Sequence, residues 1–166
     1  MKESQHAYTP PRAAAANTMP AAVARYLDGT DLLAKSQALR LSTVDAAGWP
    51  HAALLSAGDM LALPSGHLRF VIFPQSATAA NLARDGRLTI SLSLEGGMCE
   101  VRLRARQLTY SAPEVPLAFF EAEVLSARVH AAPYADVTGG IAFALREPQA
   151  VLQRWQRQIA ALSAAG

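Results

Sequence analysis

The sequence predicts an α+β fold, a small antiparallel β-barrel with peripheral helices. Between residues 38 and 111, apolar positions alternate with polar ones at the period of two that a half-buried strand requires. Turn residues separate the alternating segments, and one short helical pattern interrupts them. Strands that follow one another through tight turns pair antiparallel, so the series indicates a barrel and not a parallel βαβ sheet.

Each alternating segment has the length of a strand and ends at a turn. Residues 45–48 form the first turn, where Gly48 is free to take positive φ. Pro50 stands at the beginning of the next strand, where a missing N–H is tolerated. The six expected strands cover residues 38–44, 49–56, 60–63, 68–73, 87–94 and 98–110.

Two short helical patterns accompany these strands. Pro20 suits the first position of a helix that ends at residues 28–29. Ser76 can cap a second helix over residues 78–84. A helix between two strands of the barrel is therefore expected directly after Ser76.

The last third of the chain predicts two longer helices and one more strand. A helix is expected over residues 115–129, and a strand over 138–145. Pro148 opens a C-terminal helix. The first helix has a stripe of Leu117, Phe120, Val124 and Leu125, and the C-terminal one has an apolar face of Val151, Leu152, Trp155, Ile159 and Leu162.

Length and composition predict one globular domain. Residues 1–18, with two prolines and a run of alanines, predict a flexible N-terminal arm, and residues 19–166 predict a single domain with a C-terminal helix. The chain has 35 Ala, 13 Arg, 2 Lys and a net charge of +2, with only 17% charged residues. This composition argues against a nucleic-acid partner and favours a surface partly buried in an oligomer.

Further features predict a cytoplasmic protein without a membrane partner. No apolar run approaches the 18 residues of a membrane-spanning helix, and the polar residues 1–6 are unlike a signal peptide. Cys99 stands alone, which excludes an internal disulfide framework, and we expect a buried, inert thiol there. Four scattered His residues predict no metal site.

The residues themselves suggest two places for an anion, each with a simpler alternative. Glu100, Arg102, Arg104 and Arg106 share one strand face, which suits a phosphate or simply a solvated surface with Glu100 paired to an arginine. We favour the solvated surface because no aromatic residues accompany the arginines. Ser76 and Thr78 at a helix start can bind an anion, or Ser76 can be an ordinary N-cap.

The order of these segments resembles the FMN-binding split-barrel family, the family related to pyridoxamine 5′-phosphate oxidase. Residues 41–51, LSTVDAAGWPH, are similar to its opening hairpin. Residues 68–82, LRFVIFPQSATAANL, are similar to its strand, Ser-bearing turn and short helix, and residues 86–90 are similar to its next strand entry. The resemblance covers residues 38–110 and implies a six-stranded antiparallel split β-barrel with peripheral helices.

The resemblance also implies a flavin site, but the basic residues that hold the flavin phosphate in that family are missing. Ala53 stands where the family has an Arg, and Ala77 and Thr78 stand where it has an Arg-Lys pair. Ser76 is retained, and Glu100 falls where a flavin-contacting Gln is frequent. The cofactor-binding residues expected here are Ser76, Thr78, Asn81, His51, Arg69 and Glu100.

The leading functional hypothesis is therefore an FMN-binding protein, a flavin-dependent oxidoreductase of unknown substrate that pairs as a homodimer around a small-molecule ligand. The alternative is a split-barrel homodimer that has lost flavin and serves a binding or structural role. No catalytic residue can be named from the sequence. Haem binding would need a His ligand, and no His follows His130.

Overall fold

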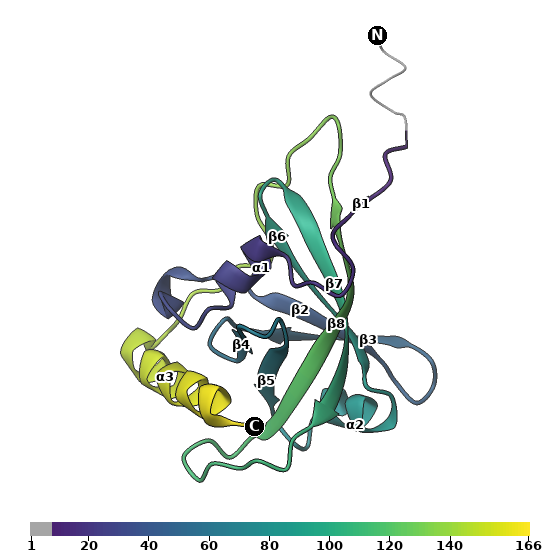
Figure 1. Cartoon of the computed structure of the whole chain (residues 1–166). Helices are drawn as coiled ribbons and strands as arrows, with labels where there is room; N and C mark the ends of the chain where they lie inside the picture. Colours follow the sequence, from purple (N-terminus) through teal and green to yellow (C-terminus); the bar gives the residue numbers. More distant parts are fainter. Residues whose placement is uncertain (1–7) are drawn as a thin grey trace.

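Seven strands form the continuous path of one eight-stranded, curved antiparallel sheet in the computed structural model, which describes residues 8–166 (Figure 1). They are β2 (Leu39–Val44), β3 (Pro50–Leu55), β4 (Met60–Ala62), β5 (Leu68–Ile72), β6 (Arg87–Leu94), β7 (Gly97–Gln107) and β8 (Ala118–His130). Their order in the sheet is β3-β2-β6-β7-β8-β5-β4. The expected α+β class is confirmed. The antiparallel sheet curls into a half-barrel, which is consistent with the expected split β-barrel, and this path has seven strands where six were predicted.

Four helices lie around this sheet: α1 (Ala21–Tyr26), the 3₁₀-helix η2 (Leu32–Ala34), α2 (Ala77–Arg84) and α3 (Pro148–Ala164). Ser76 caps α2 and Pro148 opens α3, as the sequence predicts. Pro20 is the N-cap of α1 and not the first helical residue that the sequence predicts. The first hairpin turn is also as expected, because Gly48 has φ +86° and the Asp45 carboxylate accepts hydrogen bonds from the N–H groups of Ala47 and Trp49, both at 2.9 Å.

The prediction of a helix over residues 115–129 is wrong, because this segment forms the long central strand β8. Its pairing with β7 shifts register after Arg102, where Leu125 has no Cα partner. This bulge moves the buried positions from even to odd numbers, so Val124 and Ala127 are both buried three residues apart. Phe119 and Phe120 are buried on opposite faces, in two different clusters. The bulge and the burial on both faces interrupt the alternation of apolar positions along β8, and the resulting spacing is typical of a helix.

The prediction of a strand over residues 138–145 is also wrong. Ala142 makes one isolated bridge with Gln37, and the neighbouring residues are not part of any strand. Residues 133–141, which precede this bridge, are exposed, and in the described part of the chain no strand pairs with them. One isolated bridge does not make this segment a strand.

Part of the segment expected as a flexible arm is paired with the sheet. Strand β1 (Arg12–Ala13) lies antiparallel to β8, opposite Val129 and Arg128. Residues 1–7 of the same predicted arm lie outside the described residues.

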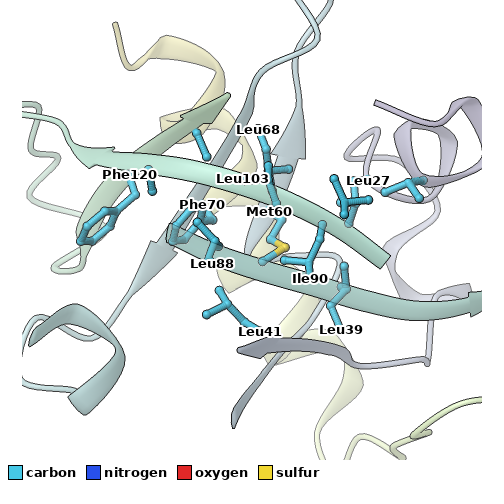
Figure 2. Packing of buried hydrophobic residues seen from close by; sticks show 14 of the residues in the cluster. Leu27, Leu39, Leu41, Met60, Leu68, Phe70, Leu88, Ile90, Leu103 and Phe120 are labelled. Atoms are coloured by element: carbon cyan, nitrogen blue, oxygen red, sulfur yellow. The ribbon is translucent and has the colours of Figure 1, made fainter. Parts of the chain in front are cut away.

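The core lies inside the curved sheet, where alternate side chains of the strands meet (Figure 2). Leu39 and Leu41 of β2 are fully buried, as are Ile90 of β6 and Leu103 of β7. In residues 8–166 no helix is long and apolar enough to cross a membrane. Burial of these core side chains inside the curved sheet stabilises the fold, because each Leu or Ile contributes about 1.5–3 kcal/mol when removed from water.

Candidate functional site

A pocket of about 560 Å³ lies between the end of β3, the end of β5, the start of α2 and one side of α3. Its volume falls within the range of small-molecule sites in proteins. The apolar part of the wall consists of Ala53, Leu54, Leu55, Val71, Ile72, Phe73, Val115, Pro116 and Leu117. The polar part consists of Asp59, Ser76, Thr78, Glu114, Arg154, Arg157 and Gln158. An apolar wall with a few polar groups suits an aromatic ligand that carries an anionic group.

The start of α2 gives the pocket its hydroxyl groups. The Ser76 hydroxyl oxygen accepts a hydrogen bond from the Ala79 N–H at 3.1 Å, which is the N-cap that the sequence predicts. This leaves the O–H of Ser76 able to donate to a ligand. Thr78 lines the same pocket and is buried. The positive end of the helix dipole at Ser76 favours an anion here.

Asp59 and Gln158 connect the pocket floor to α3. The Asp59 carboxylate accepts hydrogen bonds from the N–H and the hydroxyl of Ser56, at 2.8 and 2.9 Å, and from Gln158 Nε2 at 2.8 Å. Gln158 also donates to the Gly58 carbonyl at 2.8 Å. Neutral donors therefore satisfy the Asp59 carboxylate, and the buried amide of Gln158 fixes the rotation of the helix.

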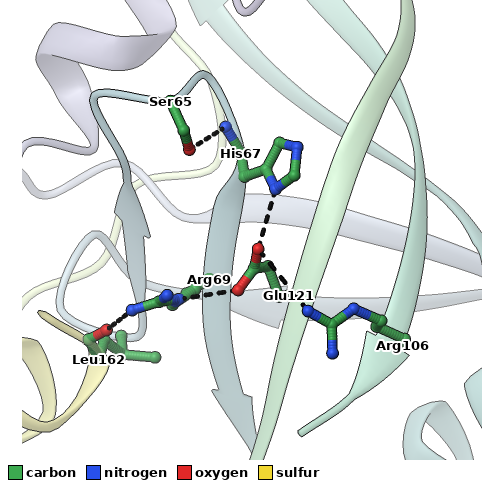
Figure 3. A network of polar contacts seen from close by, with 6 residues as sticks. All are labelled: Ser65, His67, Arg69, Arg106, Glu121 and Leu162. Carbon is green, nitrogen blue, oxygen red and sulfur yellow. Dashed lines mark hydrogen bonds and ion pairs between the residues drawn. The ribbon is translucent and has the colours of Figure 1, made fainter. Parts of the chain in front are cut away.

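A second polar network holds the C-terminal end of α3 (Figure 3). Glu121 of β8 accepts hydrogen bonds from His67 Nδ1 at 2.8 Å and from Arg69 Nε at 3.0 Å. Arg69 Nη1 donates to the Leu162 carbonyl at 3.0 Å. Hydrogen bonding to His67, followed by the hydrogen bond and charge of Arg69, lowers the pKa of Glu121 below its ordinary value despite partial burial.

The structure brings together only part of the residue set expected at a flavin. Ser76 and Thr78 line the pocket, and so does Ala53, the position of the missing strand arginine. His51 of β3 is half-buried opposite Thr43 and does not line this pocket.

The other three expected residues, Asn81, Arg69 and Glu100, make contacts with other parts of the protein. Asn81 is buried and donates to the Thr43 hydroxyl at 2.9 Å, which ties α2 to β2. Arg69 is occupied by Glu121 and the Leu162 carbonyl.

Glu100 lies on β7 near Arg102 at 3.5 Å and His130 at 3.3 Å. This is the solvated, paired arrangement that we favoured for the arginine-bearing face of that strand.

Arg154 and Arg157 are pocket residues that the sequence did not single out. Both belong to α3, three residues apart, and both line the pocket. Their spacing on one side of an amphipathic helix is the available signal. The sequence cannot say which part of the sheet that side meets, because the docking of α3 depends on partners about 100 residues away, Gly58 and Asp59.

The curved antiparallel sheet, the capped helix after β5 and the pocket beside them define a split-barrel fold. Two solved structures show the same fold. A candidate pyridoxamine 5′-phosphate oxidase from Lactobacillus delbrueckii has a TM-score of 0.54 and 16% identity, over 70% of this chain and 98% of its own. HupZ of Group A Streptococcus has a TM-score of 0.53 and 16% identity, over 72% of this chain and 99% of its own. These likenesses confirm the split-barrel fold that the opening motifs predict.

The chain belongs to the same family as the uncharacterized protein YclD of Bacillus subtilis. The two are 32% identical over 145 residues, which cover 86% of this chain and 94% of YclD. No protein-family model matches the chain.

Proposed function

We propose that this chain binds FMN in the pocket between β3, β5, α2 and α3 and acts as a flavin-dependent oxidoreductase. The observation that carries the proposal is the pocket of about 560 Å³, which contains Ser76 and Thr78 together with Ala53. These are positions where the family resemblance implies contacts to the flavin phosphate. A pocket that remains open at these residues supports a bound ligand.

The residues present fit such a group. Leu54, Phe73 and Leu117 provide apolar contact for an aromatic ring system. The hydroxyl of Ser76 and the start of α2 provide donors at an anionic end. A bound flavin would supply the redox chemistry, while the protein orients it and excludes water.

A homodimer is part of the proposal. β3 is an edge strand, and several apolar side chains on and near it are exposed: Val44, Trp49, Leu54 and Phe73. Leu54 and Phe73 also line the pocket. A second copy that covers them would bury this apolar surface and close the pocket at the same time. The proposed location is the cytoplasm, which the single free Cys99 suits.

The second candidate is a split-barrel homodimer that has lost flavin. The observation in its favour is the absence of charge at Ala53, Ala77 and Thr78. Two or three charge-assisted bonds, each worth about 1.5–3 kcal/mol, would be missing if nothing replaced them. The open pocket favours the first candidate over this one.

The test is the visible spectrum of the purified full chain, followed by titration with FMN. We expect FMN uptake at micromolar concentration by the wild type and by the control variant Ala80→Phe, which changes an exposed position of α2 outside the pocket. Ala53→Phe places a phenyl ring in the pocket and is expected to abolish uptake. A wild-type chain that takes up no FMN at high micromolar concentration would refute the flavin proposal and leave the second candidate.

A further inference from the structure

Two arginines of α3 place positive charge in the pocket. Arg154 and Arg157 are three residues apart, so they project from the same side of the helix. Both line the pocket that Ser76 and Thr78 also line. β3 and the start of α2 bring no positive charge to this pocket, because Ala53, Ala77 and Thr78 are neutral. Helix α3 supplies that charge to the same pocket.

The position of these arginines is fixed by the buried side of α3. Trp155, Gln158 and Leu162 are all buried and lie along the stripe that meets the sheet. Arg154 and Arg157 flank this stripe. A helix anchored at three buried positions cannot rotate freely, so both guanidinium groups stay on the pocket side.

Both guanidinium groups are available to a ligand. In residues 8–166, neither Arg154 nor Arg157 forms an ion pair. Two carboxylates, Asp59 and Glu114, also line the pocket. Asp59 is already hydrogen-bonded by Ser56 and Gln158, and Glu114 is exposed. The donors of both arginines are free to meet an anion that enters with its own charge.

We propose that Arg154 and Arg157 bind the phosphate group of the ligand, and so replace the basic residues that are missing at Ala53, Ala77 and Thr78. The ligand class is an aromatic phosphate monoester. The inference rests on the proposed function for the choice of FMN as that ester. The planar guanidinium fork suits a phosphate, because it donates two parallel hydrogen bonds to two of its oxygens.

The experiment compares FMN with riboflavin, which has the same ring system and no phosphate, on the full chain. Variants are the double substitution Arg154→Ala/Arg157→Ala, the double substitution of both to Lys, and the control Arg146→Ala. Arg146 is an exposed arginine just before α3 that does not line the pocket, so its loss removes charge alone.

We expect the double Ala variant to lose about 10- to 100-fold in FMN affinity, because each exposed charge-assisted contact is worth about three- to tenfold. Riboflavin affinity should stay unchanged in every variant. The Lys variant should keep part of the preference for FMN, and Arg146→Ala all of it. Added salt should weaken FMN binding to the wild type and not to the double Ala variant, because the contacts are screened.

The outcomes separate this inference from the proposed function. If the wild type binds FMN and the double Ala variant keeps the full preference over riboflavin, the arginine assignment is overturned while the flavin proposal stands. If the wild type binds neither flavin, the flavin proposal fails, and titration with inorganic phosphate decides the arginine site. NMR shifts of the Arg154 and Arg157 side-chain Nε–H resonances on addition of phosphate would then support the arginine site. If these resonances do not shift at tens of millimolar phosphate, the arginine site is overturned.

Discussion

The packing of α3 on Gly58 can be tested with a single added methyl group. A β-carbon at Gly58 would lie 2.1 Å from Trp155 Cγ and 2.4 Å from both Cδ1 and Cδ2. Ordinary carbon contacts are about 3.5–4.0 Å, so the indole ring would have to retreat by about 1.5 Å. Trp155 is 3% exposed and meets Phe143 edge to face, with ring centroids 6.2 Å apart, so the ring has no free space to enter.

We expect Gly58→Ala to lower the free energy of unfolding by about 2–3 kcal/mol. Overpacking a core costs about 1–3 kcal/mol. Expelling Trp155 completely would cost about 3–5 kcal/mol, which is the upper limit. With a urea m-value of about 2 kcal/mol/M for a domain of this size, the midpoint should fall by about 1 M.

The assay is urea unfolding followed by tryptophan fluorescence in a Trp49→Phe background, so that emission reports Trp155 alone. Gly139→Ala is the matched control, because a β-carbon at Gly139 meets nothing within 4 Å and its backbone needs no positive φ. The control should stay within about 0.5 kcal/mol of the background protein. If the midpoints of Gly58→Ala and Gly139→Ala agree within about 0.3 M, the close contact between Gly58 and Trp155 does not hold α3 in place.

Two further predictions concern titratable groups. Glu121→Gln should lower the free energy of unfolding by about 1–3 kcal/mol at pH 7, because Arg69 loses a charged acceptor. Since the pKa of Glu121 is lowered in the folded chain, its contribution is complete above the unfolded-state pKa of about 4.3 and is lost as pH falls through the lower folded-state pKa. Urea titrations at pH 7 and pH 3 should therefore show a difference that narrows at pH 3, and a constant difference would contradict the linkage. Burial raises the pKa of the Cys99 thiol, so it should react slowly with an aromatic disulfide reagent at pH 8 until urea unfolds the chain; rapid labelling of the native protein would show that the thiol is accessible.

The strands and the capped helix could be predicted because their evidence is local. Leu39, Leu41 and Thr43 of β2 alternate with outward-facing neighbours, and this pattern needs no knowledge of the partner strand. Ser76 caps α2 through an N–H three residues away, which is also a local contact. Such elements follow from short-range sequence patterns alone.

The central strand β8 could not be predicted in this way. The bulge opposite Arg102 and Leu103 changes which residues face the core, and the burial of Phe119 on the second face removes the remaining alternation. Both effects arise from neighbouring elements: β7 on one side, and α3 with the loop that precedes β8 on the other. A periodicity argument treats the segment alone and therefore favours a helix.

The pocket shows the same division between local and distant information. The sequence pointed to Ser76 and Thr78 because a helix start is a local motif, but it pointed equally to Arg69 and Asn81, whose side chains are used to hold α3 and α2. Arg154 was missed for the opposite reason, since its importance depends entirely on where α3 docks. Side-chain type alone does not distinguish a ligand-binding arginine from a structural one.

Docking of α3 and anion binding are consequently separate properties that share one helix. Arg154→Ala and Arg157→Ala remove exposed charges and leave the buried contacts of Trp155 intact, so phosphate preference should fall while the urea midpoint stays unchanged. Gly58→Ala disturbs the docking of α3 itself, so the preference for phosphate and the urea midpoint should both fall. A bound ligand stabilises the chain by about 2.7 kcal/mol at a hundredfold excess over its Kd. This amount is similar to the expected cost of Gly58→Ala, so ligand at a hundredfold excess over the variant's own, weaker Kd should restore much of the lost stability.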